Sequence, residues 1–402
     1  MTAPVDVLLA ALSPGEPGPA APLDADGRAE LLRLAALHRV QALLYAGLQR
    51  RGVLGPGVPT AVGDVLRAQA HAAALRNLRL IAETGRIATG LAKVGVPVVV
   101  LKGLHLAAAY YPSPGLREML DVDVLVRRPD VPAVAAWLAA DGYQPLAPCD
   151  VAVELEAAHH LTRHVKGECG VEVHWDLAPL DTPLGVPVDA VWQRARPFSL
   201  GRVEVRGLGA EDLLVHLAHH AIWQHGFTQG LRPLVDAAWV LAAGPGVDGA
   251  RLRAIAVDSG TPRAVTLLIG LAVRFLGAPP VPGYPDACPV PLLETAMADV
   301  LAGPESGRIH QKLARAAGGQ GVTGALRLAA REVMVPRGEL ARIVGRSPRD
   351  PLLPLFYGVR VLQLARQHGG SLARRLLRRD PEWAQVPARH SLYTWIEDPA
   401  DP

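Results

Sequence analysis

Two aspartates separated by a single valine are the residues of this chain whose spacing most directly suggests chemistry. Asp121 and Asp123 begin a valine-rich segment, and on a β-strand the side chains of residues i and i+2 point to the same face. At a rise of about 3.3 Å per residue, the two carboxylates would lie roughly 6.6 Å apart along the strand. Carboxylates placed in this way can share a pair of divalent metal ions about 3.5–4 Å apart. The alternative is a strand end with two solvated acids, although aspartate has a low strand propensity.

A third carboxylate follows in a segment where polar and apolar residues alternate. Glu172 lies between Val171 and Val173, so a strand that buries the valines turns Glu172 and His174 to its other face. Glu172 could then complete a metal site with the two aspartates. Carboxylate oxygens are hard ligands that suit Mg²⁺ or Mn²⁺ better than zinc. The alternative is an amphipathic strand whose glutamate and histidine simply face solvent.

A lysine and a glycine stand where an apolar run gives way to a helical pattern. Lys102 and Gly103 follow the valine-rich run 96–101 directly. The N-terminus of a helix presents unpaired backbone N–H groups, and a glycine lets a phosphate approach them closely. The chain has only four lysines, which makes a routine surface charge at this turn a weaker interpretation. An ordinary helix start remains the alternative. Arg117, four residues before the first aspartate, could reach a phosphate or hold the acidic loop in place.

Several histidines and one more aspartate occur in the helical patterns that follow. His216, His219 and His220 share one face of the segment 211–225, either as a polar wall of a cleft or as structural histidines. His216 and His220 have the spacing of a zinc pair, but no acidic partner completes a known motif. Asp236 is a charge within an apolar helical pattern, where an exposed or paired acid is the simplest interpretation.

The elements that must position these residues follow from hydrophobic periodicity. Helical spacing dominates residues 28–91, and short β-branched runs then alternate with helical segments. The predicted strands are 96–101, 121–126, 170–175 and 202–206; later helical patterns cover 211–225, 231–243, 250–276, 292–300, 313–335 and a basic segment, 352–379. We therefore predict an α+β fold with a small mixed-sheet core at 91–206, flanked by helical regions at 1–90 and 207–402.

The composition of the chain excludes several classes of protein. The chain of 402 residues is 50% hydrophobic and 20% charged, which excludes a disordered polymer. Its net charge of +3 gives no argument for a nucleic-acid partner. The three cysteines form no disulfide or zinc pattern, and no apolar run approaches the roughly 20 residues of a membrane span. We therefore expect a soluble cytoplasmic protein without a signal peptide and without a membrane partner.

Together these motifs resemble a known superfamily. The series Leu101-Lys-Gly103, Arg117, Asp121-Val-Asp123 and Glu172-Val-His-Trp175 is similar to the polymerase-β-type nucleotidyltransferases. The residues of these motifs are more similar to those of an uncharacterised bacterial nucleotidyltransferase family. The Leu-Lys-Gly, Arg and Asp-x-Asp pattern also resembles that of abortive-infection toxin nucleotidyltransferases. The resemblance covers roughly residues 35–245.

The resemblance implies a Mg²⁺- or Mn²⁺-dependent enzyme, with ATP or another NTP as donor. Nucleoside monophosphate would pass in line, at a two-metal site, to an unknown acceptor: a small molecule, a peptide, a protein or RNA. The implied metal ligands are Asp121, Asp123 and Glu172, and the implied donor-binding residues are Lys102, Gly103, Arg117 and His174. In such enzymes the helical domain often supplies the base that deprotonates the acceptor, which would assign that role to Asp236.

The turn after the first strand departs from the superfamily pattern, and two other functions therefore remain as alternatives. The usual turn is Gly-Ser or Gly-Gly, whereas here Leu104 follows Gly103 and no hydroxyl is present. A transferase that uses a sugar-nucleotide or another phosphate ester on a peptide or natural-product acceptor is one alternative. A non-catalytic nucleotide-binding module is the other.

Overall fold

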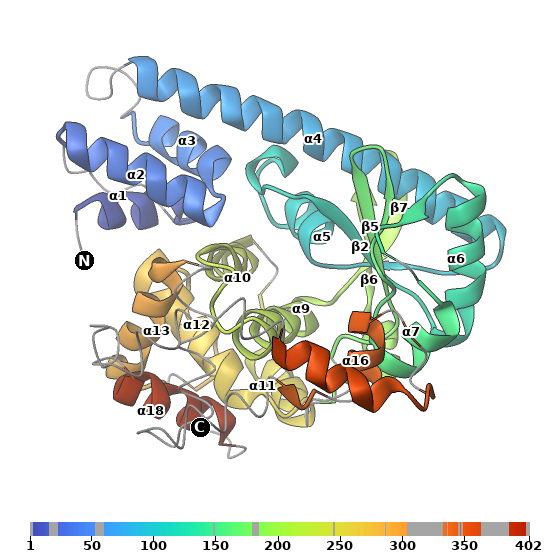
Figure 1. Ribbon diagram of the computed structural model, residues 1–402. Coiled ribbons are helices and arrows are strands. Elements are labelled where there is room, and N and C mark those ends of the chain that lie inside the picture. Colours follow the sequence, from blue (N-terminus) through green and yellow to red (C-terminus); the bar gives the residue numbers. More distant parts are fainter. Residues whose placement is uncertain are drawn as a thin grey trace.

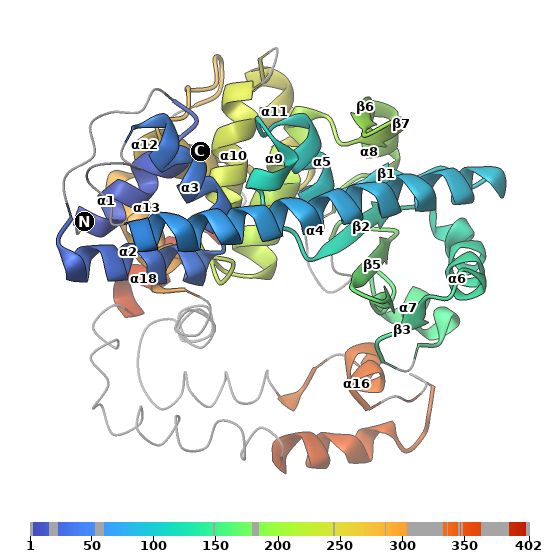
Figure 2. The same ribbon diagram turned by 90° about the horizontal axis from the view of Figure 1, so that it is seen from above.

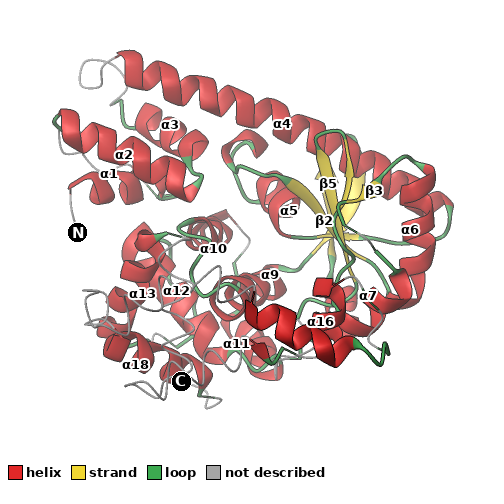
Figure 3. Cartoon of the chain, in the orientation of Figure 1, coloured by secondary structure: helices red, strands yellow, loops and turns green. Residues whose placement is uncertain are grey.

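The protein is built on a seven-stranded mixed sheet with helices on both sides (Figure 1). The computed structural model describes residues 3–15, 23–52, 60–147, 149–178, 185–243, 246–285, 287–303, 333–335, 337–344, 346, 349–362 and 386–398. Figure 3 shows that the strands gather in one half of the molecule and that helices make up the rest. The predicted α+β fold with flanking helical regions is confirmed.

The strand order is β3-β4-β5-β2-β1-β7-β6. The strands are β1 Val99–Val100, β2 Asp121–Leu125, β3 Gln144–Pro145, β4 His164–Lys166, β5 Cys169–His174, β6 Arg196–Leu200 and β7 Val203–Gly207. The central pair, β2 and β5, is parallel, and β2 is antiparallel to β1 on its other side. This pairing fixes which side chains of β2 and β5 become neighbours across the sheet.

Alternating residues of β2 point to two different cores. Val122 and Val124 pack against the long helix α4 (Thr60–Lys93) and α6 (Val131–Ala140) on one face. Leu125 belongs to the core on the opposite face, which it shares with the helices α9 (Ala210–Ala218) and α10 (Arg232–Ala243). Because side chains alternate along a strand, Asp121 and Asp123 lie on the α9–α10 side. Burial of the valines therefore turns the acids toward the helical half.

The helices that precede and follow the sheet share one apolar core. It contains residues of α1 (Ala3–Leu12), α2 (Ala25–His38), α3 (Gln41–Arg50), α9, α10, α11 (Gly249–Asp258), α12 (Pro262–Leu276), α13 (Val290–Ala302) and α18 (Val386–Glu397). Seen from above, α4 runs beside both this helical half and the sheet (Figure 2). The remaining helices are α5 Lys102–Ala109, α7 Val151–Ala157, α8 Val188–Arg194 and α16 Arg337–Val344.

The elements differ from the sequence prediction in four places. Of the predicted strand 96–101, only Val99–Val100 is a strand. The structure adds β3, β4 and β6, whose short or exposed strands lack the buried β-branched signature. The predicted helix 211–225 is an α-helix only to Ala218 and continues as a π-helical segment, His219–Gln224. The predicted helix 250–276 is two helices that meet at Gly260. Of the predicted helix 313–335 and the basic segment 352–379, residues 313–332 and 363–379 lie outside the described residues.

None of the described helices combines the length and the apolar character that crossing a lipid bilayer would require.

Candidate functional site

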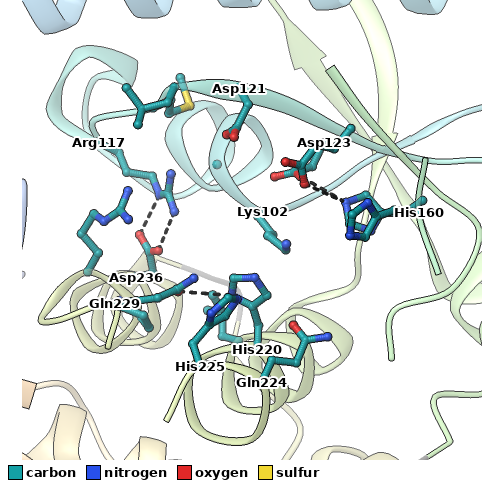
Figure 4. A pocket seen from close by; sticks show the side chains of 18 of the residues that line it. Lys102, Arg117, Asp121, Asp123, His160, His220, Gln224, His225, Gln229 and Asp236 are labelled. Atoms are coloured by element: carbon teal, nitrogen blue, oxygen red, sulfur yellow. Dashed lines mark hydrogen bonds and ion pairs between the residues drawn. The ribbon is translucent and has the colours of Figure 1, made fainter. Parts of the chain in front are cut away.

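A cavity of about 700 Å³ lies between the sheet and the helical half, and the predicted site residues line it (Figure 4). This volume falls within the range typical of sites for small molecules and cofactors. The sheet and α5 supply Lys102, Gly103, Asp121, Asp123, Glu172 and His174, while the helical half supplies Leu217, His220, Trp223, Gln224, His225, Gln229, Arg232, Pro233 and Asp236; the others are Arg39, Arg117, Met119, Leu120, His159 and His160.

Two of the three acids are direct neighbours in the parallel pair β2–β5. Asp123 is in register with Glu172, while Asp121 is in register with Gly170. A Cβ at Gly170 would lie 2.1 Å from Nε of Arg163, so glycine there makes room for that arginine. Arg163 Nη1 lies 3.5 Å from Asp121 Oδ2. The sheet register thus brings Asp123 and Glu172 together and gives Asp121 a cationic neighbour.

His174 joins these two acids. Its Nε2 lies 3.2 Å from Asp123 Oδ1 and 3.7 Å from Glu172 Oε2. Ligand atoms of Asp123, Glu172 and His174 all lie within 4.8 Å of one another. This set of two carboxylates and one imidazole fits a divalent cation, and Asp121 stands next to it without being part of the group. Carboxylates favour Mg²⁺ or Mn²⁺, and an imidazole tolerates Mn²⁺ better than Mg²⁺.

The carboxylates strongly influence one another's protonation. Burial, together with the charges of Asp123 and Asp121, raises the pKa of Glu172 to about 7. Burial and the charge of Asp123 also raise the pKa of Asp121. Burial alone would raise the pKa of Asp123, but the charge of Lys102 and the hydrogen bond with His174 hold it below its ordinary value. Such concentrated negative charge is relieved when a cation binds between the acids.

Lys102 is placed by an unusual backbone turn. It is the first residue of α5 and has a φ of 34°, in the left-handed region that a lysine rarely adopts. The preceding Leu101 N–H donates a 2.9 Å hydrogen bond to the carbonyl oxygen of Asp123, which ties the start of α5 to β2. In Figure 4 the Lys102 side chain extends into the cavity between the acids and the helical wall. The turn therefore directs a cation toward the carboxylates.

Arg117 and Asp236 form a buried pair that joins the loop before β2 to α10. Nε and Nη2 of Arg117 each donate a 2.9 Å hydrogen bond to one oxygen of Asp236, and the Tyr111 hydroxyl donates another at 2.7 Å. Burial opposes the charged form of Arg117, but the ion pair raises its pKa overall. Both oxygens of Asp236 are thus engaged, which is not the arrangement expected of the general base predicted from the sequence. The hydrogen bonds give Asp236 the geometry of a residue that positions Arg117.

Gly103 lies directly beneath this arginine. A Cβ at position 103 would lie 2.8 Å from Nη1 of Arg117 and 3.4 Å from the Met119 side chain. The glycine therefore allows the arginine to reach the N-terminal end of α5, where backbone N–H groups are available.

Of the three histidines that the sequence allowed as a polar wall of a cleft, His220 lines the cavity. His220 Nδ1 lies 3.2 Å from Gln229 Oε1, and the His220 and His225 rings are 4.4 Å apart between centroids. The π-helical segment His219–Gln224 offsets the face of the helix, and such segments often occur at functional sites. His216 is buried, and no described metal-binding group contains the His216–His220 pair.

Arg39 and Arg232 also line the cavity, and the sequence motifs did not indicate them. Arg39 follows α2 in a left-handed conformation with a φ of 53°. Arg232 is the first residue of α10. They come from segments almost 200 residues apart, so only the fold reveals that they share a site. The sequence His38-Arg-Val40 lies within the stretch that the resemblance covers, but it gives Arg39 no role.

Comparison with known proteins agrees with this geometry. The chain matches the model of a family described as uncharacterised nucleotidyltransferase over residues 24–277. No curated protein matches it. The matched span is more than half of the chain and includes every residue that lines the cavity. The chain therefore belongs to this family of uncharacterised nucleotidyltransferases.

Proposed function

We propose that the protein transfers a nucleoside monophosphate from an NTP to an acceptor, with Mg²⁺ or Mn²⁺ bound at Asp123, Glu172 and His174. The observation that carries this proposal is the cross-strand pairing of Asp123 with Glu172 beside the Lys102–Gly103 turn. Asp121 would be a further ligand once its charge is shared with a cation. A divalent cation bound there would act as a Lewis acid that withdraws charge from phosphoryl oxygens.

The chain's own residues would hold the donor around the start of α5. The backbone N–H groups near Gly103 and the Lys102 ammonium would bind phosphate oxygens, since helix N-termini favour anions. Arg117, held by Asp236, would present its Nη1 to the same phosphates. Fixed cations of this kind stabilise the charge that develops on phosphoryl oxygens in the transition state.

His220 would accept the proton from the acceptor. Acceptor attack on the α-phosphorus forms a new bond to phosphorus, breaks the bond to the bridging oxygen and releases pyrophosphate. The hydrogen bond from Nδ1 to Gln229 leaves Nε2 of His220 with a free lone pair. His220 also lines the cavity near Lys102, whose charge acts on it.

The decisive experiment combines metal binding with transfer. Each NTP labelled at the α-phosphate is incubated with the purified protein and cell extract, and labelled products are identified by mass spectrometry. We expect Asp123→Asn and Glu172→Gln to lower transfer at least about 100-fold and Mn²⁺ affinity by more than about 10-fold. Chelation of divalent ions should abolish transfer in the unaltered protein.

A matched control is available on the same sheet. Glu204 is an exposed glutamate on β7, so Glu204→Gln removes a strand carboxylate without touching the cavity. It should leave both readouts unchanged. Full transfer by Asp123→Asn, or Mn²⁺ affinity equal to that of the Glu204 variant, would show that the proposal is wrong.

A further inference from the structure

Positive charge gathers at the helical end of the cavity. Arg39, Arg117 and Arg232 come from three different segments, and the charges of Arg117 and Arg39 both act on Arg232. Arg117 is paired with Asp236, to which it donates two hydrogen bonds. Neither Arg39 nor Arg232 makes an ion pair with another residue of the described segments.

Arg232 is the more deeply placed of the two. Its Nε is buried and has no hydrogen-bond partner in the described part of the chain. Burial and the charge of Arg117 lower its pKa, and the charges of Asp236 and Glu118 only partly offset them. A guanidinium does not lose its proton in a protein, so this buried donor carries an unbalanced charge. An anion from solution would satisfy it.

The backbone of Arg39 has a left-handed conformation that arginine rarely adopts. It caps α2 in the left-handed region, at φ 53° and ψ 54°, where glycine or asparagine is usual. A non-glycine residue is strained in this conformation, and such residues concentrate at ligand-binding sites. His38 packs against Gly230, whose Cβ would lie 2.4 Å from the His38 ring, so Arg39 is fixed close to the loop before Arg232.

We propose that Arg39 and Arg232 form a phosphate-binding subsite at the end of the cavity away from the carboxylates. The proposal rests on the proposed nucleotidyl transfer for its ligand class, a phosphate group. Guanidinium groups bind phosphate oxygens in a bidentate manner, which gives both charge and geometry. The subsite would join the N-terminal helices and α10 through one bound anion.

The terminal phosphate of the donor is the source that the geometry favours. Arg117 lies between the carboxylate end of the cavity and the Arg39–Arg232 end. Its Nη1 lies over Gly103, while its Nε and Nη2 bind Asp236 of α10, the helix that begins at Arg232. A triphosphate that begins at the carboxylates and passes Gly103 would therefore end at Arg232 and Arg39. A phosphate carried by the acceptor is the other source.

Binding of inorganic tripolyphosphate by isothermal titration calorimetry tests the subsite without any turnover. We expect Arg39→Asn and Arg232→Gln each to weaken tripolyphosphate binding at least 10-fold. Asparagine tolerates the left-handed backbone at position 39, so this variant should fold. Arg196→Gln, at an exposed position on β6, removes the same charge elsewhere and should bind as the unaltered protein does.

A second titration, with O-phosphoserine, distinguishes the two sources. Weakened binding of tripolyphosphate alone supports the donor phosphate, and weakened binding of O-phosphoserine alone supports an acceptor phosphate. If both variants bind both probes as tightly as Arg196→Gln does, the subsite does not exist. Arginine-dependent tripolyphosphate binding in a protein that transfers no nucleotide would keep the subsite and overturn the proposed function instead.

Discussion

His220 has its proton fixed on one ring nitrogen. The carboxamide oxygen of Gln229 only accepts hydrogen bonds, so Nδ1 of His220 donates at 3.2 Å. Burial lowers the pKa of His220 well below its ordinary value, and the nearby charge of Lys102 lowers it further. The ring is therefore neutral at neutral pH and has Nε2 ready as a proton acceptor.

Replacement of this histidine should affect turnover more than binding. We expect His220→Gln to lower kcat by about 10²- to 10⁴-fold, the usual contribution of a general base. Nucleotide binding should change little, because the proposed site of the donor phosphates is at α5. Steady-state kinetics with the acceptor found by labelling measures both quantities, and His71→Gln, at an exposed position on α4, is the control. A His220→Gln variant with unchanged kcat would exclude it as the base.

The packing of α5 against the sheet brings another buried histidine into the core. His105 is 3% exposed and packs against Phe198 of β6, with ring centroids 4.7 Å apart. Gly207 of β7 leaves room for it, because a Cβ there would lie 2.5 Å from the ring. Burial lowers the pKa of His105 from 6.5 to about 4. The contact between α5 and the sheet therefore depends on a neutral ring.

The stability of this packing should depend on pH. The unfolded chain takes up a proton on His105 below pH 6.5, whereas the folded chain does so only near pH 4, so acid favours unfolding. His105→Leu removes this effect. Between pH 7.5 and 5.5 the variant should lose about 1.4 kcal/mol less free energy of unfolding than the unaltered protein. Urea titrations at both pH values measure the difference, and equal losses in both proteins would contradict the prediction.

At the scale of single elements, the alternation of apolar and polar residues predicted which side chains of a strand share a face. The valines of 122–126 and 171–173 determine the faces of β2 and β5, so the common side of Asp123 and Glu172 followed from period-two patterning. The register of a parallel pair is set by distant packing, and no local pattern revealed that Asp123 and not Asp121 lies beside Glu172.

Contacts between distant segments could not be predicted from the sequence either. The charge of Asp236 within an apolar helix was visible, but its partner Arg117 lies 119 residues earlier. The π-helical turn after Ala218 was hidden because its residues have ordinary helical spacing. Arg39 and Arg232 required the three-dimensional fold, since each belongs to a helix end with no recognisable motif.

At the scale of the whole molecule, α18 closes the helical half. Arg389 Nε donates a 2.6 Å hydrogen bond to Asp299 of α13, and the two residues are only 3% and 6% exposed. Tyr393 of the same helix lies beside Phe227, with ring centroids 6.4 Å apart, in the segment that leads to the cavity wall. The helix thus supports α13 and the wall of the site together.

Loss of this buried ion pair should destabilise the fold. We expect Arg389→Met to lower the free energy of unfolding by about 3–5 kcal/mol, because the buried Asp299 carboxylate would lose its 2.6 Å hydrogen bond and ion pair with the Arg389 guanidinium. The double variant Arg389→Met, Asp299→Leu should recover much of the loss, since the buried carboxylate is removed together with the guanidinium. Chemical denaturation of the three proteins forms the comparison. A double variant less stable than Arg389→Met would contradict this account.

The late position of α18 in the chain has a consequence during translation. The strands and α10 leave the ribosome first, and at about 5–20 residues per second the chain from Asp236 to Glu397 takes roughly 8–30 s to synthesise. From the time that α12 and α13 are made until α18 follows, the apolar surfaces that α18 later covers lack this partner. The wall of the cavity therefore gains the support of α18 only late in synthesis, when this last described helix has docked.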